Sequence, residues 1–249
     1  MTTNEGIHSV VHTIRILEQF QNGEGLSASD LAQRVGIPRA TVHRILKTLV
    51  LHQILRQDND KKYRLTLRLM KLGNAALSTP SLQQLVNPLL NSLVDATQET
   101  AHFSVLDGYQ VGYVAKQESP HQFRMLSYVG WRGPLHATAS GKVLLSFSDE
   151  ELIHSVLEKP LEAYTDHTIT DPLTLRQEIQ GIRTNKYAEE DEELSDGLTC
   201  IAVPVVLTNR QIGALSVSGP KHRMKQLDKA KIVDLLHQMS DEITKKLHG

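Results

Sequence analysis

Residues 36–50, GIPRATVHRILKTLV, constrain the fold of this 249-residue chain more than any other segment. Four apolar residues recur at i, i+3, i+4 and i+7, the spacing that places them on one side of an α-helix: Val42, Ile45, Leu46 and Leu49. The other side holds small, hydroxyl and cationic residues, and no acidic residue occurs between Leu31 and Val50. The pattern predicts a helix that docks its apolar side on its own domain and presents a cationic side outward.

The flanking segments predict a helix-turn-helix followed by a wing. An earlier helix is indicated by apolar residues at helical spacing: Val10, Val11, Ile14, Leu17 and Phe20. Ser27 is expected to cap a short second helix with Asp30 in its first turn, and Gly36 to end it. After the basic helix, residues 54–57 and 62–67 have the composition of two short strands joined by a polar turn. The order is that of a winged DNA-binding module.

The cationic side of the central helix suits the major groove of DNA. Ala40 permits close approach, Thr41 and Arg44 can reach base edges or phosphates, and Lys47 suits the backbone. The residues predicted to contact DNA are Ser29, Arg39, Ala40, Thr41, His43, Arg44, Lys47, Lys61, Lys62 and Tyr63. The alternatives are a solvated cationic face and a winged helix that binds protein. Charge segregation favours DNA, because residues 1–71 carry 11 Lys and Arg against 6 Asp and Glu, and the remainder 16 against 22.

The rest of the chain alternates helix and strand patterns, which predicts an α+β domain. Strands are expected at 102–106, 111–115, 123–128, 200–207 and 212–218, and helices at 81–99, from Ala139, from Pro172 behind a capping Asp171, and at 226–247. A further helical pattern begins at Leu67 and is broken by STPS. The predicted organisation is therefore a DNA-binding domain over 1–66, a linker helix over 67–80 and a second domain over 81–249.

Composition excludes several classes of protein. No stretch approaches the roughly 20 apolar residues of a membrane span, and the N-terminus has no signal-peptide pattern. A single cysteine excludes an internal disulfide framework and favours the cytoplasm. His8 and His12 are four apart but have no acidic partner of the HExxH type, and no phosphate-binding or dinucleotide-binding glycine loop is present. We expect no metal, no cofactor and no membrane partner.

Several motifs in order resemble the IclR family of bacterial transcriptional regulators. They are LSASDLAQRVGIPRATVHRILKTL, KYRLTLRLMKLG, TQETAHFSVLDG, VGWRGPLHATASGKVLLS, EEDEELSDGLTCIAVPV and GALSVSGP. The resemblance covers roughly residues 8 to 220. Two positions depart from it, because Gln53 and Lys186 stand where the family usually has a glycine in a turn.

The resemblance implies a winged helix-turn-helix joined by a helical linker to a GAF-like effector-binding domain. It implies a regulator, by family habit a repressor, that binds operator DNA as a homodimer or homotetramer and senses a small organic acid or an aromatic catabolite. It also implies an effector site at Ala139, Ser140, Glu190, Cys200, Ser216 and Ser218. Backbone N–H groups where a loop enters a helix attract carboxylates, which fits Ala139 and Ser140. An aromatic content of 4% favours a small aliphatic acid.

The rival hypothesis is an enzyme, a GAF-like hydrolase with Cys200 as nucleophile. His136 or His102 would have to activate the thiol. Cys200 instead begins an apolar strand-like run, where cysteine often serves as a small hydrophobic residue, and no cysteine-protease signature surrounds it. We therefore expect no catalytic residue.

Overall fold

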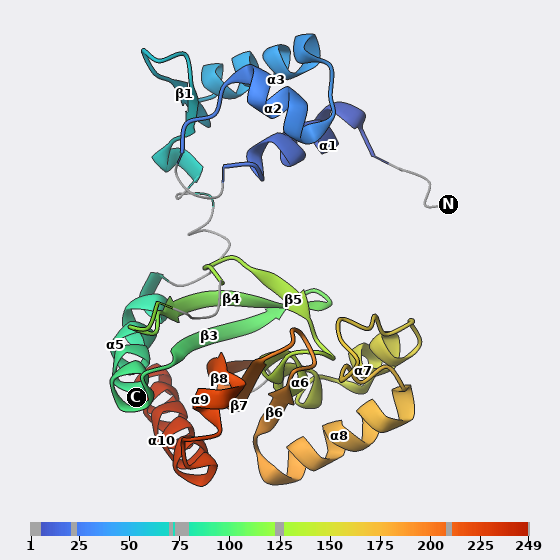
Figure 1. The fold of residues 1–249 in the computed structure, drawn as a ribbon, viewed down its shortest axis with the longest axis vertical. Helices are drawn as coiled ribbons and strands as arrows, with labels where there is room; N and C mark the ends of the chain where they lie inside the picture. The colour runs from blue at the N-terminus through green and yellow to red at the C-terminus, as the bar shows by residue number, and fades with distance from the viewer. Residues whose placement is uncertain are drawn as a thin grey trace. The chain divides into compact units, whose positions relative to one another are not determined.

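The computed structural model describes residues 6–20, 24–69, 72, 80–122, 127–207 and 211–248. The chain forms two compact units, Met1–Thr79 and Pro80–Gly249 (Figure 1). Within the described residues, every helix is too short or too polar to cross a membrane. Most of the expected linker helix lies outside the described residues, which include Leu67 to Leu69 and Leu72 in helical conformation.

The N-terminal unit is a helix-turn-helix with a two-stranded wing, as the sequence predicts. Its elements follow in the order α1 (His8–Leu17), α2 (Ala28–Val35), α3 (Arg39–Leu51), β1 (Leu55–Gln57) and β2 (Tyr63–Leu65). The strands β1 and β2 pair antiparallel. The α2 helix begins with a capping box, in which Ser27 and Asp30 each bond the other's backbone N–H. It ends at Gly36, whose φ of 65° provides the left-handed turn into α3.

The core of this unit takes the predicted apolar side of α3 and only part of α1. Val42, Ile45, Leu46 and Leu49 are all buried, which confirms the helical pattern. On α1, Ile16 is fully buried, whereas Val10 and Ile14 remain 52% and 51% exposed. The apolar residues of α1 therefore lie on two sides of the helix, and one side is left uncovered within this unit.

The C-terminal unit is built on one antiparallel sheet in the order β5-β4-β3-β8-β7-β6. Its strands are β3 (Thr100–Asp107), β4 (Gln110–Gln117), β5 (Arg132–Pro134), β6 (Ala188–Asp191), β7 (Leu198–Val206) and β8 (Ile212–Pro220). Its helices are α5 (Pro80–Thr97), α6 (Ala139–Ser146), α7 (Glu150–Leu157), α8 (Pro172–Asn185), α9 (Lys221–Met224) and α10 (Lys229–His248). Mixed helices and an antiparallel sheet confirm the predicted α+β class.

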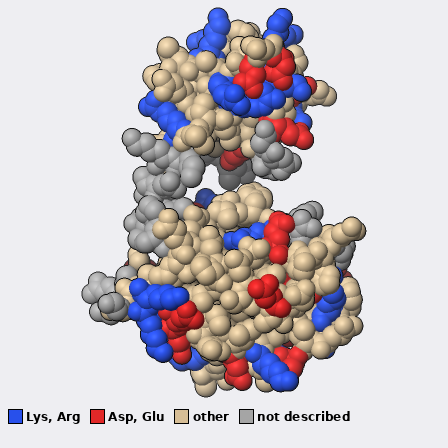
Figure 2. Space-filling model, turned by 90° about the vertical axis from the view of Figure 1, so that its left-hand side faces the viewer, with Lys and Arg blue, Asp and Glu red and all other residues tan. Residues whose placement is uncertain are grey.

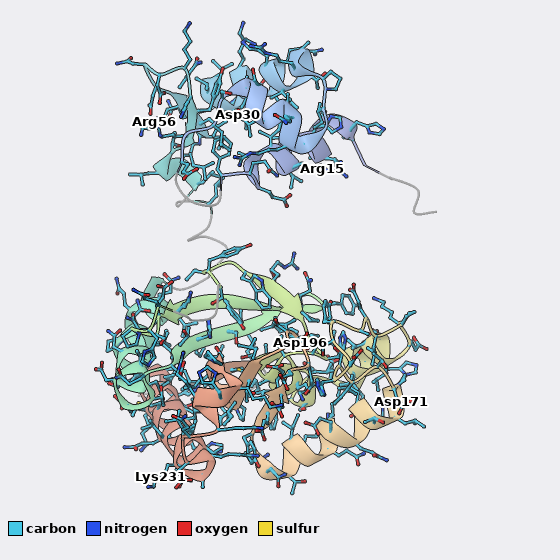
Figure 3. All side chains as sticks on the ribbon, in the orientation of Figure 1. Arg15, Asp30, Arg56, Asp171, Asp196 and Lys231 are labelled. Atoms are coloured by element: carbon cyan, nitrogen blue, oxygen red, sulfur yellow. The ribbon has the colours of Figure 1, made fainter. Side chains whose placement is uncertain are left out.

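Helices cover both faces of this sheet (Figure 1). The helices α5 and α10 pack against each other and against β3, β4 and β7 on one face. On the other face α6 packs on β6, β7 and β8, and α8 packs behind α6. Asp171, labelled in Figure 3, caps α8 as predicted by accepting a hydrogen bond from the Thr174 N–H. The central strands of the sheet are thus buried on both faces.

Three features of the C-terminal unit differ from the sequence prediction. Residues 123–126 of the expected third strand lie outside the described residues, and the next strand found is β5. The edge strand β6, which includes the start of the acidic segment EEDEE, was not among the expected strands. The sequence pattern also missed α7. Short strands and helices carry too few residues for periodicity to reveal them.

Gln53 and Lys186, which replace the family glycines, both adopt the left-handed conformation, with φ of 58° and 61°. We expect Gln53→Gly to raise the free energy of unfolding by about 0.5–1 kcal/mol, because glycine relieves left-handed strain but loses more chain entropy. Denaturant unfolding of the full chain measures this change. Lys186→Gly should raise the free energy of unfolding less. It also removes the cation–π contact of the Lys186 ammonium group, which lies 4.9 Å from the Phe147 ring centroid. Destabilisation by Gln53→Gly would contradict the strain argument.

Candidate DNA interface and effector site

The outward side of α3 carries most of the residues predicted to contact DNA. Arg39, Ala40, His43, Arg44 and Lys47 are exposed. Thr41 is half-buried, and Ser29 is exposed in the first turn of α2. Among the described residues, none of the three cations on α3 forms an ion pair. Their charge is therefore available to a polyanion.

The wing holds its own arginines in ion pairs. Arg64 pairs with Asp58 and with Asp60, the latter at 3.3 Å, and Arg56 pairs with Asp58 at 3.0 Å. Figure 2 shows the wing end of this unit, where acidic and basic side chains lie next to one another. The guanidinium group of Arg64 also packs where a side chain at Gly25 would lie. Arg64 thus braces the wing against the segment before α2 and is not free to bind phosphate.

At the tip of the wing, Lys61 and Lys62 are exposed, but Tyr63 is not. The Tyr63 side chain is 4% exposed and belongs to the core of the unit, and its backbone exchanges two hydrogen bonds with Leu26. The contact of Tyr63 with DNA stays a prediction, and little of its side chain is exposed to make one. Successive side chains of a strand alternate between its two sides, so Tyr63 points inward while Arg64 points outward.

In the C-terminal unit, the sheet face beneath α6 is polar. Directly opposed residues of antiparallel strands share a face, as do residues two apart in one strand. Glu190 opposes Cys200, Cys200 opposes Ser218, and Ser218 opposes Thr100. In the next row, His102 opposes Ser216. We call this set the polar face; its members are Thr100, His102, Ser104, Tyr113, Glu190, Cys200, Ser216 and Ser218, none more than 7% exposed.

The opposite face of the same strands is apolar and packs under α5 and α10. It carries Phe103, Ile201, Val203, Leu215 and Val217, all buried. An antiparallel sheet with one polar face normally turns that face to water. Here the polar face is covered by α6. Polar residues are mostly exposed in folded proteins, so a buried polar surface of this size is unusual. It marks the part of the unit where a polar ligand would be held.

The helix α6 begins directly over the polar face. Thr138 caps it, because its Oγ1 accepts the Gly141 N–H at 3.0 Å and its carbonyl accepts the Lys142 N–H. The N–H groups of Ala139 and Ser140 have no hydrogen-bond partner among the described residues. Free first-turn N–H groups and the positive end of the helix dipole favour an anion.

Two buried hydroxyl groups strengthen this assignment. Ser140 Oγ on α6 and Ser216 Oγ on β8 are both buried and have no hydrogen-bond partner in the part of the chain that the structure describes. Ser216 Oγ lies beside the Cys200 thiol. An unsatisfied buried polar group costs about 1–3 kcal/mol. A ligand that bonds both hydroxyls would remove that cost.

Glu190 presents a carboxyl group with two backbone donors. Its Oε1 accepts the N–H of Glu193 at 2.7 Å and of Leu194 at 3.1 Å. Burial raises the pKa of Glu190 to about 7, more than these hydrogen bonds lower it. Near neutral pH this group is therefore available both as carboxylate and as carboxylic acid, and so can accept or donate a hydrogen bond.

Aromatic rings border the polar face at β3 and β4. The Tyr113 ring lies 4.4 Å from that of His102 and 4.7 Å from that of Trp131, centroid to centroid. Burial lowers the pKa of His102 to about 3, so its ring is neutral, with Nε2 2.7 Å from Ser127 Oγ. Burial raises the pKa of Tyr113, and the proximity of Cys200 and Glu190 adds to this. Tyr113 therefore belongs to the same polar face as the predicted residues.

Sequence reasoning missed Thr100, Ser104 and Tyr113, and weighed His102 only as a partner for Cys200. A signal was present in TAHFSV, the first six residues of β3, where polar and apolar residues alternate strictly. That alternation identifies a two-faced strand. It does not reveal that α6, far along the chain, covers the polar side.

Cys200 is not an activated nucleophile. Burial raises the pKa of its thiol, and the nearby Glu190 raises it further, so the thiol is protonated. His136 is engaged elsewhere, with Nε2 2.9 Å from the carbonyl oxygen of Glu162. The hydrolase hypothesis thus finds no thiolate, and His136 is not available to form one.

Comparison with known proteins finds a matching family for each of the two units. Residues 9–59 match the IclR helix-turn-helix domain, and residues 74–245 match the C-terminal domain of bacterial IclR transcriptional regulators. The chain is 33% identical to the HTH-type transcriptional regulator KdgR of Dickeya chrysanthemi, over 98% of this chain and 81% of that protein. It is 31% identical to the HTH-type transcriptional regulator BhcR of Paracoccus denitrificans, over 96% and 87%.

Solved structures agree along the whole chain. An IclR homologue of Microbacterium hydrocarbonoxydans in complex with 4-hydroxybenzoate superposes with a TM-score of 0.83, at 29% identity, over 96% of this chain and 99% of that one. The IclR protein of Thermotoga maritima gives a TM-score of 0.78, at 26% identity, over 97% and 99%. The matched families and relatives are transcriptional regulators and not enzymes. The chain therefore belongs to the IclR family of DNA-binding transcriptional regulators, with a helix-turn-helix domain and an effector-binding domain.

Proposed function

We propose that this regulator is a cytoplasmic repressor whose operator binding is controlled by a small organic acid held between α6 and the polar face. The buried polar face with two unpartnered hydroxyl groups is the observation that carries the proposal. We assign DNA recognition to residues over 1–66, linkage to 67–80 and effector binding to 81–249. The α3 helix enters the major groove, while Lys61 and Lys62 meet flanking phosphate.

The chemistry of the site favours a carboxylic acid that also carries a hydroxyl or carbonyl group. The N–H groups of Ala139 and Ser140 suit the carboxylate, and Ser216 and Ser218 lie on the facing strand. Glu190 suits a hydroxyl group. The neighbouring Tyr113 ring also suits an aromatic acid, which the 4% aromatic content did not favour. The 4-hydroxybenzoate bound by the Microbacterium homologue has this chemistry.

We propose that the partner subunit is a second copy that covers the exposed side of α1. Ile7, Val10 and Ile14 are 73%, 52% and 51% exposed and recur at the three- and four-residue spacing of a helix–helix seam. A winged helix reads too few base pairs alone, so paired half-sites require a two-fold dimer.

Ile14→Glu is expected to shift the protein towards monomer and to weaken operator binding, because the charge would be buried at the seam. Sedimentation velocity with and without DNA measures both effects. Leu173→Glu, at a residue 72% exposed on α8, is the matched control and should change neither. An unchanged dimer in Ile14→Glu would place the subunit contact elsewhere.

The proposed control is a population shift. A ligand seated between α6 and the sheet favours one packing of the effector-binding domain, and with it one separation of the two DNA-binding domains in the dimer. The test is binding of the purified protein to its own upstream intergenic DNA, with and without a panel of small carboxylates that includes 4-hydroxybenzoate. Salt-sensitive binding that one acid releases supports the proposal. Absence of DNA binding at low salt, or of any response to the acids, contradicts it.

Ser216→Ala separates ligand binding from stability. We expect about tenfold weaker effector binding, because one hydrogen bond of about 1–1.5 kcal/mol is lost. We expect unchanged or slightly higher stability, because the Ser216 hydroxyl has no hydrogen-bond partner among the described residues. Calorimetric titration and thermal unfolding measure the two effects. Ser146→Ala is the matched control, since that hydroxyl already donates to the Lys142 carbonyl at 2.6 Å and should affect only stability.

A further inference from the structure

Lys142 is a buried cation with two acidic partners. Its side chain is 1% exposed, and its Nζ lies 2.7 Å from Oε1 of Glu193 and 3.3 Å from Oε1 of Glu178 on α8. Taking an ammonium group out of water costs several kcal/mol unless the geometry compensates. A methionine or leucine would fill the same position without this cost. Its position in the first turn of α6, two residues after Ser140, calls for an explanation that packing does not supply.

The contacts of Lys142 lead directly to Glu190. Glu193, which Lys142 holds through its side chain, donates its own N–H to Oε1 of Glu190 at 2.7 Å. The Glu193 carbonyl is fixed in turn by Thr168 Oγ1 at 2.6 Å. Glu193, which follows β6, is thus held at three points. Its side chain bonds α6, its carbonyl bonds the loop before α8, and its N–H bonds the carboxyl group of Glu190.

We propose that Lys142 is a positioning residue of the effector site: its ammonium group holds Glu193, and the main chain of Glu193 holds the carboxyl group of Glu190 at the polar face. The inference rests on the proposed effector site. Removing Lys142 should therefore disorganise Glu190, although Lys142 itself does not touch the ligand.

Electrostatics gives this role a signature that simple packing would lack. The charged and titratable groups facing Glu190 are Glu193 on its own segment, Lys142 on α6, Cys200 on β7 and Tyr113 on β4, with Glu178 of α8 behind Lys142. Lys142 lowers the pKa of Glu190, and Glu193 raises it. Neutralising these two residues should therefore shift the titration of Glu190 in opposite directions.

The test is carbon NMR of the full-length protein labelled at its glutamate carboxyl groups, titrated with pH. The Glu190 signal is identified by its loss in Glu190→Gln. In Lys142→Met we expect its midpoint to rise. In Glu193→Gln, which keeps an oxygen acceptor for Lys142 but removes the charge, we expect the midpoint to fall. Lys231→Met, an exposed lysine on α10, is the matched control and should leave the midpoint unchanged.

A second measurement uses 4-hydroxybenzoate as the probe. We expect Lys142→Met to bind it at least about tenfold more weakly than the wild type, an effect of about 1.4 kcal/mol or more. If the wild type binds no acid, the proposed function fails, yet the NMR midpoints still decide the role of Lys142. If Lys142→Met does not fold, the midpoint of the Glu190 titration in Glu193→Gln tests the inference. An unshifted Glu190 midpoint in every folded variant overturns the inference.

Discussion

Arg44→Ala is expected to weaken operator binding by a factor of about 5 to 150, or about 1–3 kcal/mol. Arg44 is exposed on α3, between the buried Val42 and Ile45 that fix the helix on its domain. Its guanidinium group is paired with no carboxylate of the described residues. It therefore enters a complex without first breaking an ion pair. Alanine is the strongest helix former, so the substitution should not unfold α3.

Fluorescence anisotropy with labelled operator DNA at several salt concentrations measures this effect. Lys47→Ala should weaken operator binding less than Arg44→Ala does. It should also reduce the slope of log affinity against log salt by about one, as expected for the loss of a phosphate contact. Lys231→Ala in the C-terminal unit removes the same charge far along the chain and serves as the control. If Arg44→Ala binds operator and unrelated DNA as the wild type does, α3 is not the reading helix.

Gly141→Ala is expected to lower the free energy of unfolding of the C-terminal unit by about 1–3 kcal/mol and to abolish the response to effector. A Cβ at this position would lie 2.7 Å from the Leu135 carbonyl oxygen and 2.5 Å from Thr138 Oγ1. Real Cβ atoms do not approach backbone so closely, and the backbone of Leu135 has no freedom to rotate away. The start of α6 would therefore have to move off the polar face.

Gly181→Ala is the matched control, because a Cβ there meets no atom within 4 Å and the residue lies inside α8. It should stabilise the protein by about 0.5–1 kcal/mol, through the higher helix propensity of alanine. Thermal unfolding of both variants gives the comparison. Equal stability of Gly141→Ala and the wild type would mean that α6 is not seated as closely as the geometry requires.

Sequence patterns predicted the N-terminal unit in detail because its determinants are local. The capping pair Ser27 and Asp30, the turn at Gly36 and the apolar side of α3 each depend on residues within a few positions of one another. The burial of Tyr63 was not predictable for the opposite reason. KKY reads as one polar run, but a short strand alternates its sides, and the core that receives Tyr63 is formed by distant helices.

In the C-terminal unit, long helices and the central strands were predictable, whereas the extent of the polar face was not. Its rows join β3 to β8 and β6 to β7, so Thr100 and Ser218 become neighbours across more than a hundred residues. The family resemblance supplied six positions of the proposed site. It did not supply Tyr113 or Lys142, because their importance depends on which groups the folded sheet and α6 bring to face them.

The polar face also bears on how long each molecule of this regulator survives. Because Ser140 Oγ and Ser216 Oγ have no hydrogen-bond partner among the described residues, the effector-free domain retains an energetic penalty that the proposed acid would remove. A ligand at about 100 times its Kd stabilises the folded state by about 2.7 kcal/mol. Stability changes of this size alter the steady-state abundance of a protein several-fold, because proteases act on the unfolded fraction. The metabolite that signals through this domain would then also slow its turnover, so that the amount of regulator rises and falls with the pool that it senses.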